Sequence, residues 1–245
     1  MDIARTIAVR PIGQAMEIEA AEDAMARRGR SHYNRAREAL PADTLPILPM
    51  RPARLIPPSE FRVMPWKSGG GRTFEIHAHP EGADFDAFEW RISLAEVAAS
   101  GPFSLFPGID RTLVLLEGNG IRLSGEGADI VLRASYDACD FGGERAIRGA
   151  LVDGPVRDFN LMVRRDRVRG GVTIARGTRV SVVAARWALC YAAAGAHRCL
   201  RDGAPLIELP QGHALLVEAG AVGLGITIEP AAPSAVALVA TIEPR

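Results

Sequence analysis

The segment 65–71, Pro-Trp-Lys-Ser-Gly-Gly-Gly, holds the residues best suited to chemistry. Three consecutive glycines let backbone N–H groups turn toward one point, which is the geometry of an anion-binding nest. A lysine adds positive charge and a tryptophan adds a flat apolar surface, so the segment predicts a site for a carboxylate or phosphate beside a planar group. The alternative is a flexible turn with a surface lysine. The candidate ligand-binding residues here are Trp66, Lys67, Ser68, Gly69, Gly70 and Gly71.

Arginines on expected strands form a second candidate set. Arg91 and Ser93 share one face of the strand expected at 90–97, and Arg111 begins the strand expected at 111–117. A guanidinium that points into a β-barrel is costly unless it meets an anion, which suggests a bidentate carboxylate ligand. The anion could instead be internal, and the candidates are Glu75, Glu96, Asp110 and Asp158.

Two further polar residues alternate with apolar ones on the strand expected at 157–163. Asp158 and Asn160 alternate with Phe159 and Leu161, so the two polar side chains share a face. They are candidates for orienting a bound polar group.

A metal site is considered and not favoured. Gly71-x5-His77-x-His79 matches the opening of the metal motif of cupins, and strict alternation over 73–79 places Glu75 on the same face as both histidines. The later glutamate of that motif is missing at its expected spacing, and no histidine occurs from Pro80 to Ala196. We therefore expect no metal and no cofactor, with His77 and His79 as the residues of the alternative.

Nucleophilic catalysis has little support in the sequence. The pattern G-x-S-x-G is absent, and the three cysteines share no metal-type spacing, which is typical of reduced thiols in a cytoplasmic protein. Acid–base work by Glu75 and Glu96 remains open, as does a Schiff base at Lys67, which is the one lysine among 29 basic residues. An enzyme is thus the less favoured class.

Composition and charge exclude several classes. The 29 basic and 29 acidic side chains balance, so no global charge favours nucleic acid or an anionic membrane. No basic region followed by an apolar run marks a signal peptide. The apolar run at 231–241 contains Pro233 and is too short to span a bilayer. We expect no nucleic-acid partner and no membrane partner.

The elements that must position these residues are short strands. Helix formers dominate 14–28 and 31–40, and prolines punctuate 41–58, so residues 1–50 predict a partly helical or disordered extension, unless Met50 is the natural start. From Phe61 onward, apolar residues recur with a period of two, which predicts an all-β sandwich or barrel. An apolar strand followed by a turn of small residues occurs at 113–120 and again at 187–195. This repeat suggests two consecutive barrels divided near 164–171.

Four blocks of the chain resemble the HutD/Ves family: PWKSGGG (65–71), FEWRISLAEV (88–97), GPFSLFPGIDRTLVLLEG (101–118) and LVDGPVRDFNLM (151–162). The resemblance implies a bicupin, two tandem RmlC-like jelly-roll barrels, with an extension at 1–50, a first barrel at 51–166 and a second at 167–245. It also implies a link to histidine utilisation, in which the protein binds a small acidic metabolite, formylglutamate- or urocanate-like, and limits pathway activity. Ser104 and Phe106 stand where metal-binding relatives place histidines. Two positions depart from the family pattern: Ser68 replaces an asparagine and Phe74 an arginine.

Together these features predict a non-metal, cytoplasmic small-molecule-binding protein that modulates histidine utilisation. Lys67, the amides of Gly69 to Gly71, Arg91 and Arg111 are expected to contact anionic oxygens. Trp66 and Phe106 are expected to form apolar walls, while Ser93, Asp158 and Asn160 orient polar groups. A homodimer is a candidate assembly. The alternatives are a cupin-type enzyme, metal-dependent or acid–base, acting on a small carboxylic acid, and a regulator whose extension contacts a protein partner.

Overall fold

The computed structural model describes residues 53–66, 69–182, 185–219 and 225–245. Almost all of these residues lie in antiparallel strands and the turns that join them, so the expected all-β class is confirmed. The expected helices at 14–28 and 31–40, and the candidate residues Lys67 and Ser68, lie outside the described residues. Among the described residues, no helix has the length and apolar character needed to cross a bilayer.

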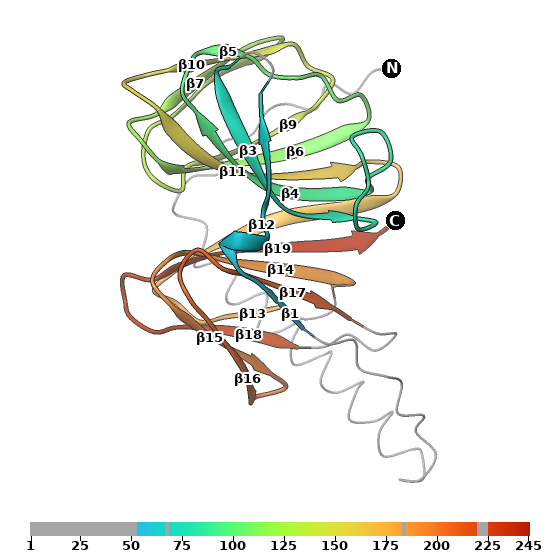
Figure 1. Cartoon of the computed structure of the whole chain (residues 1–245), viewed down its shortest axis with the longest axis vertical. Coiled ribbons are helices and arrows are strands. Elements are labelled where there is room, and N and C mark those ends of the chain that lie inside the picture. Colours follow the sequence, from blue (N-terminus) through green and yellow to red (C-terminus); the bar gives the residue numbers. More distant parts are fainter. Residues whose placement is uncertain (1–52, 67–68, 183–184, 220–224) are drawn as a thin grey trace.

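The strands form two barrels, each made of two facing sheets (Figure 1). The first barrel contains β2 (Arg62–Pro65), β3 (Gly71–His79), β4 (Trp90–Val97), β5 (Gly101–Pro102), β6 (Ile109–Glu117), β7 (Ile121–Gly125), β8 (Ala128–Leu132), β9 (Ala138–Gly142), β10 (Ile147–Leu151) and β11 (Val156–Arg164). The second contains β12 (Val168–Arg176), β13 (Val180–Val182), β14 (Trp187–Ala194), β15 (His197–Arg201), β16 (Ala204–Leu209), β17 (Ala214–Glu218), β18 (Ile226–Pro230) and β19 (Val236–Pro244), joined by β1 (Arg54–Ile56). A short 3-10 helix, η1 (Pro58–Glu60), follows β1.

The strand orders show that the second barrel repeats the first. Adding eight to each label of the order β4-β11-β6-β9 gives β12-β19-β14-β17, which is also observed. The same shift converts β5-β10-β7-β8 into the observed order β13-β18-β15-β16. The rhythm shared by 113–120 and 187–195 thus belongs to equivalent strands, β6 and β14. This confirms the expected tandem of cupin barrels.

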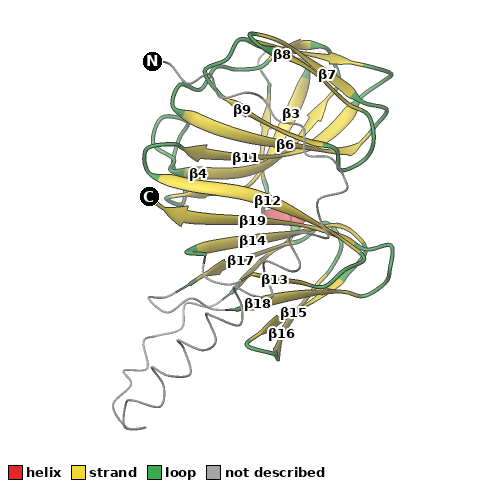
Figure 2. Cartoon of the chain, turned by 180° about the vertical axis from the view of Figure 1, so that it is seen from behind, coloured by secondary structure: helices red, strands yellow, loops and turns green. Residues whose placement is uncertain are grey.

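The first described strand, β1, lies in the second barrel, although the strands that follow it belong to the first. It pairs with β17, so residues 54–56 extend the five-stranded sheet of the second barrel, whereas β2 and β3 extend the six-stranded sheet of the first. In Figure 2 the chain is seen from behind, with η1 between the two barrels. The strands of the second barrel therefore come from both sides of the expected boundary near 164–171.

The two large sheets pack face to face, and their contact forms an extensive apolar cluster. Trp90, Ile92 and Leu94 of β4 meet residues such as Leu189 of β14 and Leu238 of β19 there, all of them fully buried or nearly so. The opposite face of β4 points into the first barrel. Both faces of this strand are consequently buried, and alternation sends Arg91 and Ser93 into the barrel interior as the sequence predicts.

A β-bulge overturns the expected face of the two histidines. The register between β3 and β4 shifts between Glu75 and His77, so strict alternation fails there. Glu75 stays on the interior face, where it meets Arg91. His77 and His79 lie on the other face, with ring centroids 5.1 and 5.7 Å from that of Trp90. The expectation that Glu75 shares a face with the histidines is therefore wrong.

We expect the apolar contact between the barrels to make a large contribution to stability. Leu238→Ala should lower the free energy of unfolding by about 2–5 kcal/mol, because it removes a fully buried side chain and leaves a cavity between the sheets. Urea unfolding followed by tryptophan fluorescence and circular dichroism measures the loss. Leu105→Ala is the matched control, because Leu105 is 57% exposed and its truncation should cost less than about 0.5 kcal/mol. Equal effects of the two substitutions would contradict this account of the core.

Candidate functional site

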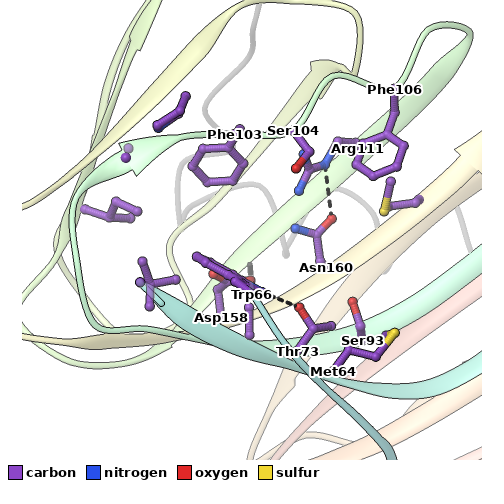
Figure 3. Close-up of a pocket in the computed structure, with 18 of the residues that line it drawn as sticks. Met64, Trp66, Thr73, Ser93, Phe103, Ser104, Phe106, Arg111, Asp158 and Asn160 are labelled. Carbon is purple, nitrogen blue, oxygen red and sulfur yellow. Dashed lines mark hydrogen bonds between the residues drawn. The ribbon is translucent and has the colours of Figure 1, made fainter. Parts of the chain in front are cut away.

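The first barrel encloses a cavity of about 750 Å³ between its two sheets (Figure 3). Strands β4, β6 and β11 supply most of its polar wall, and apolar residues from β2, β5, β7 and the segments that flank them complete the lining. The predicted residues that line it are Trp66, Gly70, Arg91, Ser93, Phe106, Arg111, Asp158 and Asn160. Gly69 and Gly71 are not among the lining residues. One cavity thus collects polar residues that the sequence places on three separate strands.

Arg111 places a buried positive charge on the wall of the cavity. Its guanidinium lies 5.0 Å from the ring centroid of Phe141, 5.1 Å from Phe103 and 5.8 Å from Phe106. Its Nε donates a hydrogen bond of 3.4 Å to Asn160 Oδ1, and it forms no ion pair with a carboxylate of the described residues. Burial lowers the pKa of Arg111 to about 10, so the group remains charged at neutral pH. The aromatic rings hold the cation without neutralising it.

Asp158 is the buried acidic group of the same wall. Burial raises its pKa to about 7, against the smaller opposing effects of the charge on Arg111 and a hydrogen bond from Asn160. Its Oδ1 has no hydrogen-bond partner among the described residues. The three side chains form a chain in which Arg111 donates to Asn160 and Asn160 donates to Asp158. At neutral pH the carboxyl group is therefore present in both protonation states.

Arg91 differs from Arg111 because an internal carboxylate neutralises it. Its Nε lies 2.6 Å from Glu75 Oε2, while its Nη1 reaches Ser93 Oγ at 3.5 Å, and the guanidinium lies over the ring of Phe85. Its Nη2 is buried and has no partner among the described residues. Internal pairing, one of the two interpretations of this arginine, is thus what the structure shows. Arg91 can still offer a hydrogen-bond donor, but it adds no net charge.

The glycines after Trp66 serve packing and turn formation. The N–H of Gly69 donates to the carbonyl of Trp66 and closes a turn in which Gly69 has φ +71. A Cβ on Gly71 would lie 2.3 Å from the carbonyl oxygen of Glu96 and 3.0 Å from the indole of Trp66. Gly71 therefore lets the indole lie against the backbone as a cavity wall, held by a 2.8 Å hydrogen bond from its Nε1 to Thr73 Oγ1. The Gly69 N–H is thus committed to a turn.

Several lining residues were not predicted from sequence. Phe103, Thr73 and Phe85 line the cavity, and Phe141 packs behind Arg111. Phe103 and Phe106 belong to one short segment, and its repeated phenylalanines were the sequence signal for an aromatic wall. Nothing in the local sequence marks Phe141 on β9.

The departure from the family pattern at Phe74 has no bearing on the cavity wall, because this ring packs against the cluster between the barrels.

The histidines do not form a metal site with neighbouring acids or thiols. Among the described residues, no group of three histidine, cysteine or carboxylate side chains is placed to hold an ion. The three cysteines are free and buried, and burial raises the pKa of Cys139 to about 12 and that of Cys199 to about 11. These thiols are protonated at neutral pH and are poor nucleophiles.

The second barrel provides an internal comparison for the cavity. Strands β14 and β19, the equivalents of β6 and β11, turn Ala188, Cys190 and Ala192, and Ala237 and Val239, into their barrel. These residues belong to one buried apolar cluster, where the first barrel has Arg111, Asp158 and Asn160. At these positions the polar lining is therefore particular to the first barrel, although the second barrel buries His197 and Arg201 on β15.

The HutD family model matches residues 58–237. The chain belongs to the HutD family. A protein of Pseudomonas putida, described as an uncharacterized 21.2 kDa protein in the hutC 3' region, is 36% identical over 144 residues, which are 59% of this chain and 75% of that protein. Protein Ves of Citrobacter koseri is 35% identical over 176 residues, 65% of this chain and 91% of its own. The family is associated with histidine utilisation.

Solved structures agree with the family and the fold. HutD from Pseudomonas fluorescens SBW25, solved in a formate condition, is 27% identical with a TM-score of 0.67, over 79% of this chain and 99% of its own. The Pseudomonas aeruginosa PAO1 protein PA5104, of unknown function, is 29% identical with a TM-score of 0.73, over 79% and 100%. YlbA from E. coli, a cupin-fold protein at 12% identity and a TM-score of 0.56 over 84% and 96%, shows likeness of fold alone.

The raised pKa of Asp158 predicts a specific pH dependence of stability. Because the folded protein binds this proton more tightly than the unfolded chain, the contribution of Asp158 is fully present below about pH 4 and is lost as the pH rises through about 7. The slope between these values should be at most about 1.4 kcal/mol per pH unit. Asp158→Asn should remove it, as measured by urea unfolding from pH 5 to 8 at constant ionic strength. Asp129→Asn, at an exposed surface pair with Arg122, should retain it. An unchanged slope in Asp158→Asn would disprove the assignment.

Proposed function

We propose that the first barrel binds a small carboxylate-bearing metabolite of histidine catabolism, urocanate- or formylglutamate-like, and that the protein modulates histidine utilisation through this binding. The observation that carries the proposal is the guanidinium of Arg111, which is buried on the cavity wall and forms no ion pair with a carboxylate of the described residues. A buried charge is expensive without a partner, and a ligand carboxylate is the partner that matches a guanidinium in shape and charge.

The rest of the cavity suits a small acid with an apolar or planar part. Arg91 Nη2 is a buried donor that has no partner among the described residues. Trp66, Phe103 and Phe106 supply flat apolar surfaces around the polar wall. A volume of about 750 Å³ lies within the usual range of about 300–1,000 Å³ for small-molecule sites.

We expect urocanate and N-formylglutamate to raise the melting temperature of the protein. A ligand that binds only the native state at about one hundred times its Kd adds about 2.7 kcal/mol, which corresponds to a shift of several degrees for a chain of this size. Differential scanning fluorimetry measures the shift. Methyl urocanate, which lacks the carboxylate, should give no shift. A flat melting temperature with both acids would overturn the proposal.

Variants test whether Arg111 is the anchor. Arg111→Met should abolish the shift, because it removes the charge and keeps an apolar side chain of similar length. Arg122→Met is the matched control, since Arg122 is an exposed arginine on β7 that pairs with Asp129. The sequence predicts the same loss for Lys67→Ala, at a position outside the described residues. A full shift in Arg111→Met would place the carboxylate elsewhere.

A second candidate function is acid–base catalysis on the same acid. The pKa of Asp158, about 7, suits a group that both donates and accepts a proton at neutral pH. If the protein is an enzyme, proton NMR of urocanate or N-formylglutamate incubated with it should show product signals that disappear in Asp158→Asn. Unchanged spectra in the presence of binding would leave the non-enzymatic binding protein as the function.

A further inference from the structure

The carboxyl group of Asp158 faces a wall that supplies it with few donors. On β11, Asp158 lies opposite Ala95 of β4 and Leu115 of β6, so neither neighbouring strand places a polar side chain beside it. Asn160 donates to the carboxyl group, and Oδ1 is left without a partner among the described residues. The indole N–H of Trp66, another lining residue, is committed to Thr73 Oγ1 at 2.8 Å. Because Asp158 lines the cavity, a bound ligand can supply the missing donor.

We propose that the cavity selects acids that also carry an N–H donor, and that Asp158 is the specificity-determining residue that accepts this hydrogen bond. This inference rests on the proposed function, because it concerns a second contact of the same ligand. The carboxylate of the ligand occupies the Arg111 end, and its N–H group meets Asp158. Asn160 links the two charged groups, because it accepts a hydrogen bond from Arg111 (Figure 3) and donates one to Asp158.

The charges of the wall agree with a ligand of this kind. Glu75 neutralises Arg91, which leaves Arg111 and Asp158 as the complementary pair that faces the ligand. In both protonation states the Asp158 carboxyl group keeps an acceptor oxygen, so an N–H donor is accommodated on either side of neutral pH. A ligand that lacks the donor leaves that acceptor buried and unpaired, which carries the full desolvation cost of the group. The preference thus arises from a penalty against the wrong ligand as well as from the bond itself.

Matched ligand pairs test the inference by isothermal titration calorimetry on the full chain. Urocanate is compared with 3-(3-furyl)acrylate, which keeps the carboxylate and a planar ring but has no N–H. N-formylglutamate is compared with N-formyl-N-methylglutamate, in which a methyl group replaces the amide hydrogen. In each pair we expect the N–H ligand to bind at least about tenfold more tightly, as for a hydrogen bond to a charged or buried group.

Variants at Asp158 separate selectivity from stability. Asp158→Leu should bind both members of a pair with equal affinity, and Asp158→Asn should keep part of the preference because its amide oxygen still accepts. Asp129→Asn, at the exposed pair on β8, should keep all of it. Circular dichroism and melting temperatures establish that each variant is folded, and Asp158→Asn carries the test alone if Asp158→Leu does not fold.

The outcomes distinguish this inference from the proposed function. Equal affinities within both pairs for the wild-type protein would overturn the role of Asp158 and leave carboxylate binding intact. A preference that persists at full size in both Asp158 variants would also overturn it. No binding of any of the four acids to the wild-type protein would overturn the proposed function, and the inference with it.

Discussion

The burial of the central strands of the six-stranded sheet on both faces is the constraint on which the cavity depends. One face of β4 packs Trp90, Ile92 and Leu94 against the second barrel, and the other turns Arg91 and Ser93 into the first. A polar side chain on such a strand cannot turn away to the protein surface, because both sides of its strand are covered. Its hydrogen bonds and its charge must find partners in the protein or in the contents of the cavity. The character of the site thus follows from the docking of the two barrels.

The two barrels differ in what they bury on their equivalent strands. On β14 and β19 the second barrel turns small and aliphatic residues such as Ala188, Cys190 and Val239 inward, and it presents Leu189 and Leu238 to the contact with the first. It therefore supplies apolar burial without a polar interior at these positions. The apolar contact between the barrels offsets the unfavourable burial of Arg111 and Asp158 in the first barrel. A single barrel with the polar cavity would lack the apolar layer that covers the outer face of β4.

Alternation along strands made much of the site predictable. Arg91 and Ser93, and Asp158 and Asn160, could be placed on interior faces because their strands are regular and flanked by turns. The prediction failed at the bulge between Glu75 and His77, because one extra residue reverses the faces and the sequence carries no local signal for it. Contacts between strands that lie far apart in the sequence could not be predicted either. The pairing of Arg91 with Glu75 was one of several candidates, and the position of Phe141 behind Arg111 depends on how β9 joins the sheet.

The choice of arginine at position 111 follows from the same burial. A buried lysine loses its proton readily, because an ammonium ion is compact and strongly hydrated, and desolvation can lower its pKa by several units. The guanidinium is planar and weakly hydrated, and three phenylalanine rings within 5.8 Å hold it. Its pKa falls only to about 10, so it keeps its charge in the cavity at neutral pH. An arginine in an aromatic enclosure is thus the side chain that can hold a permanent positive charge on this wall, while Asp158 on the same wall titrates near neutrality.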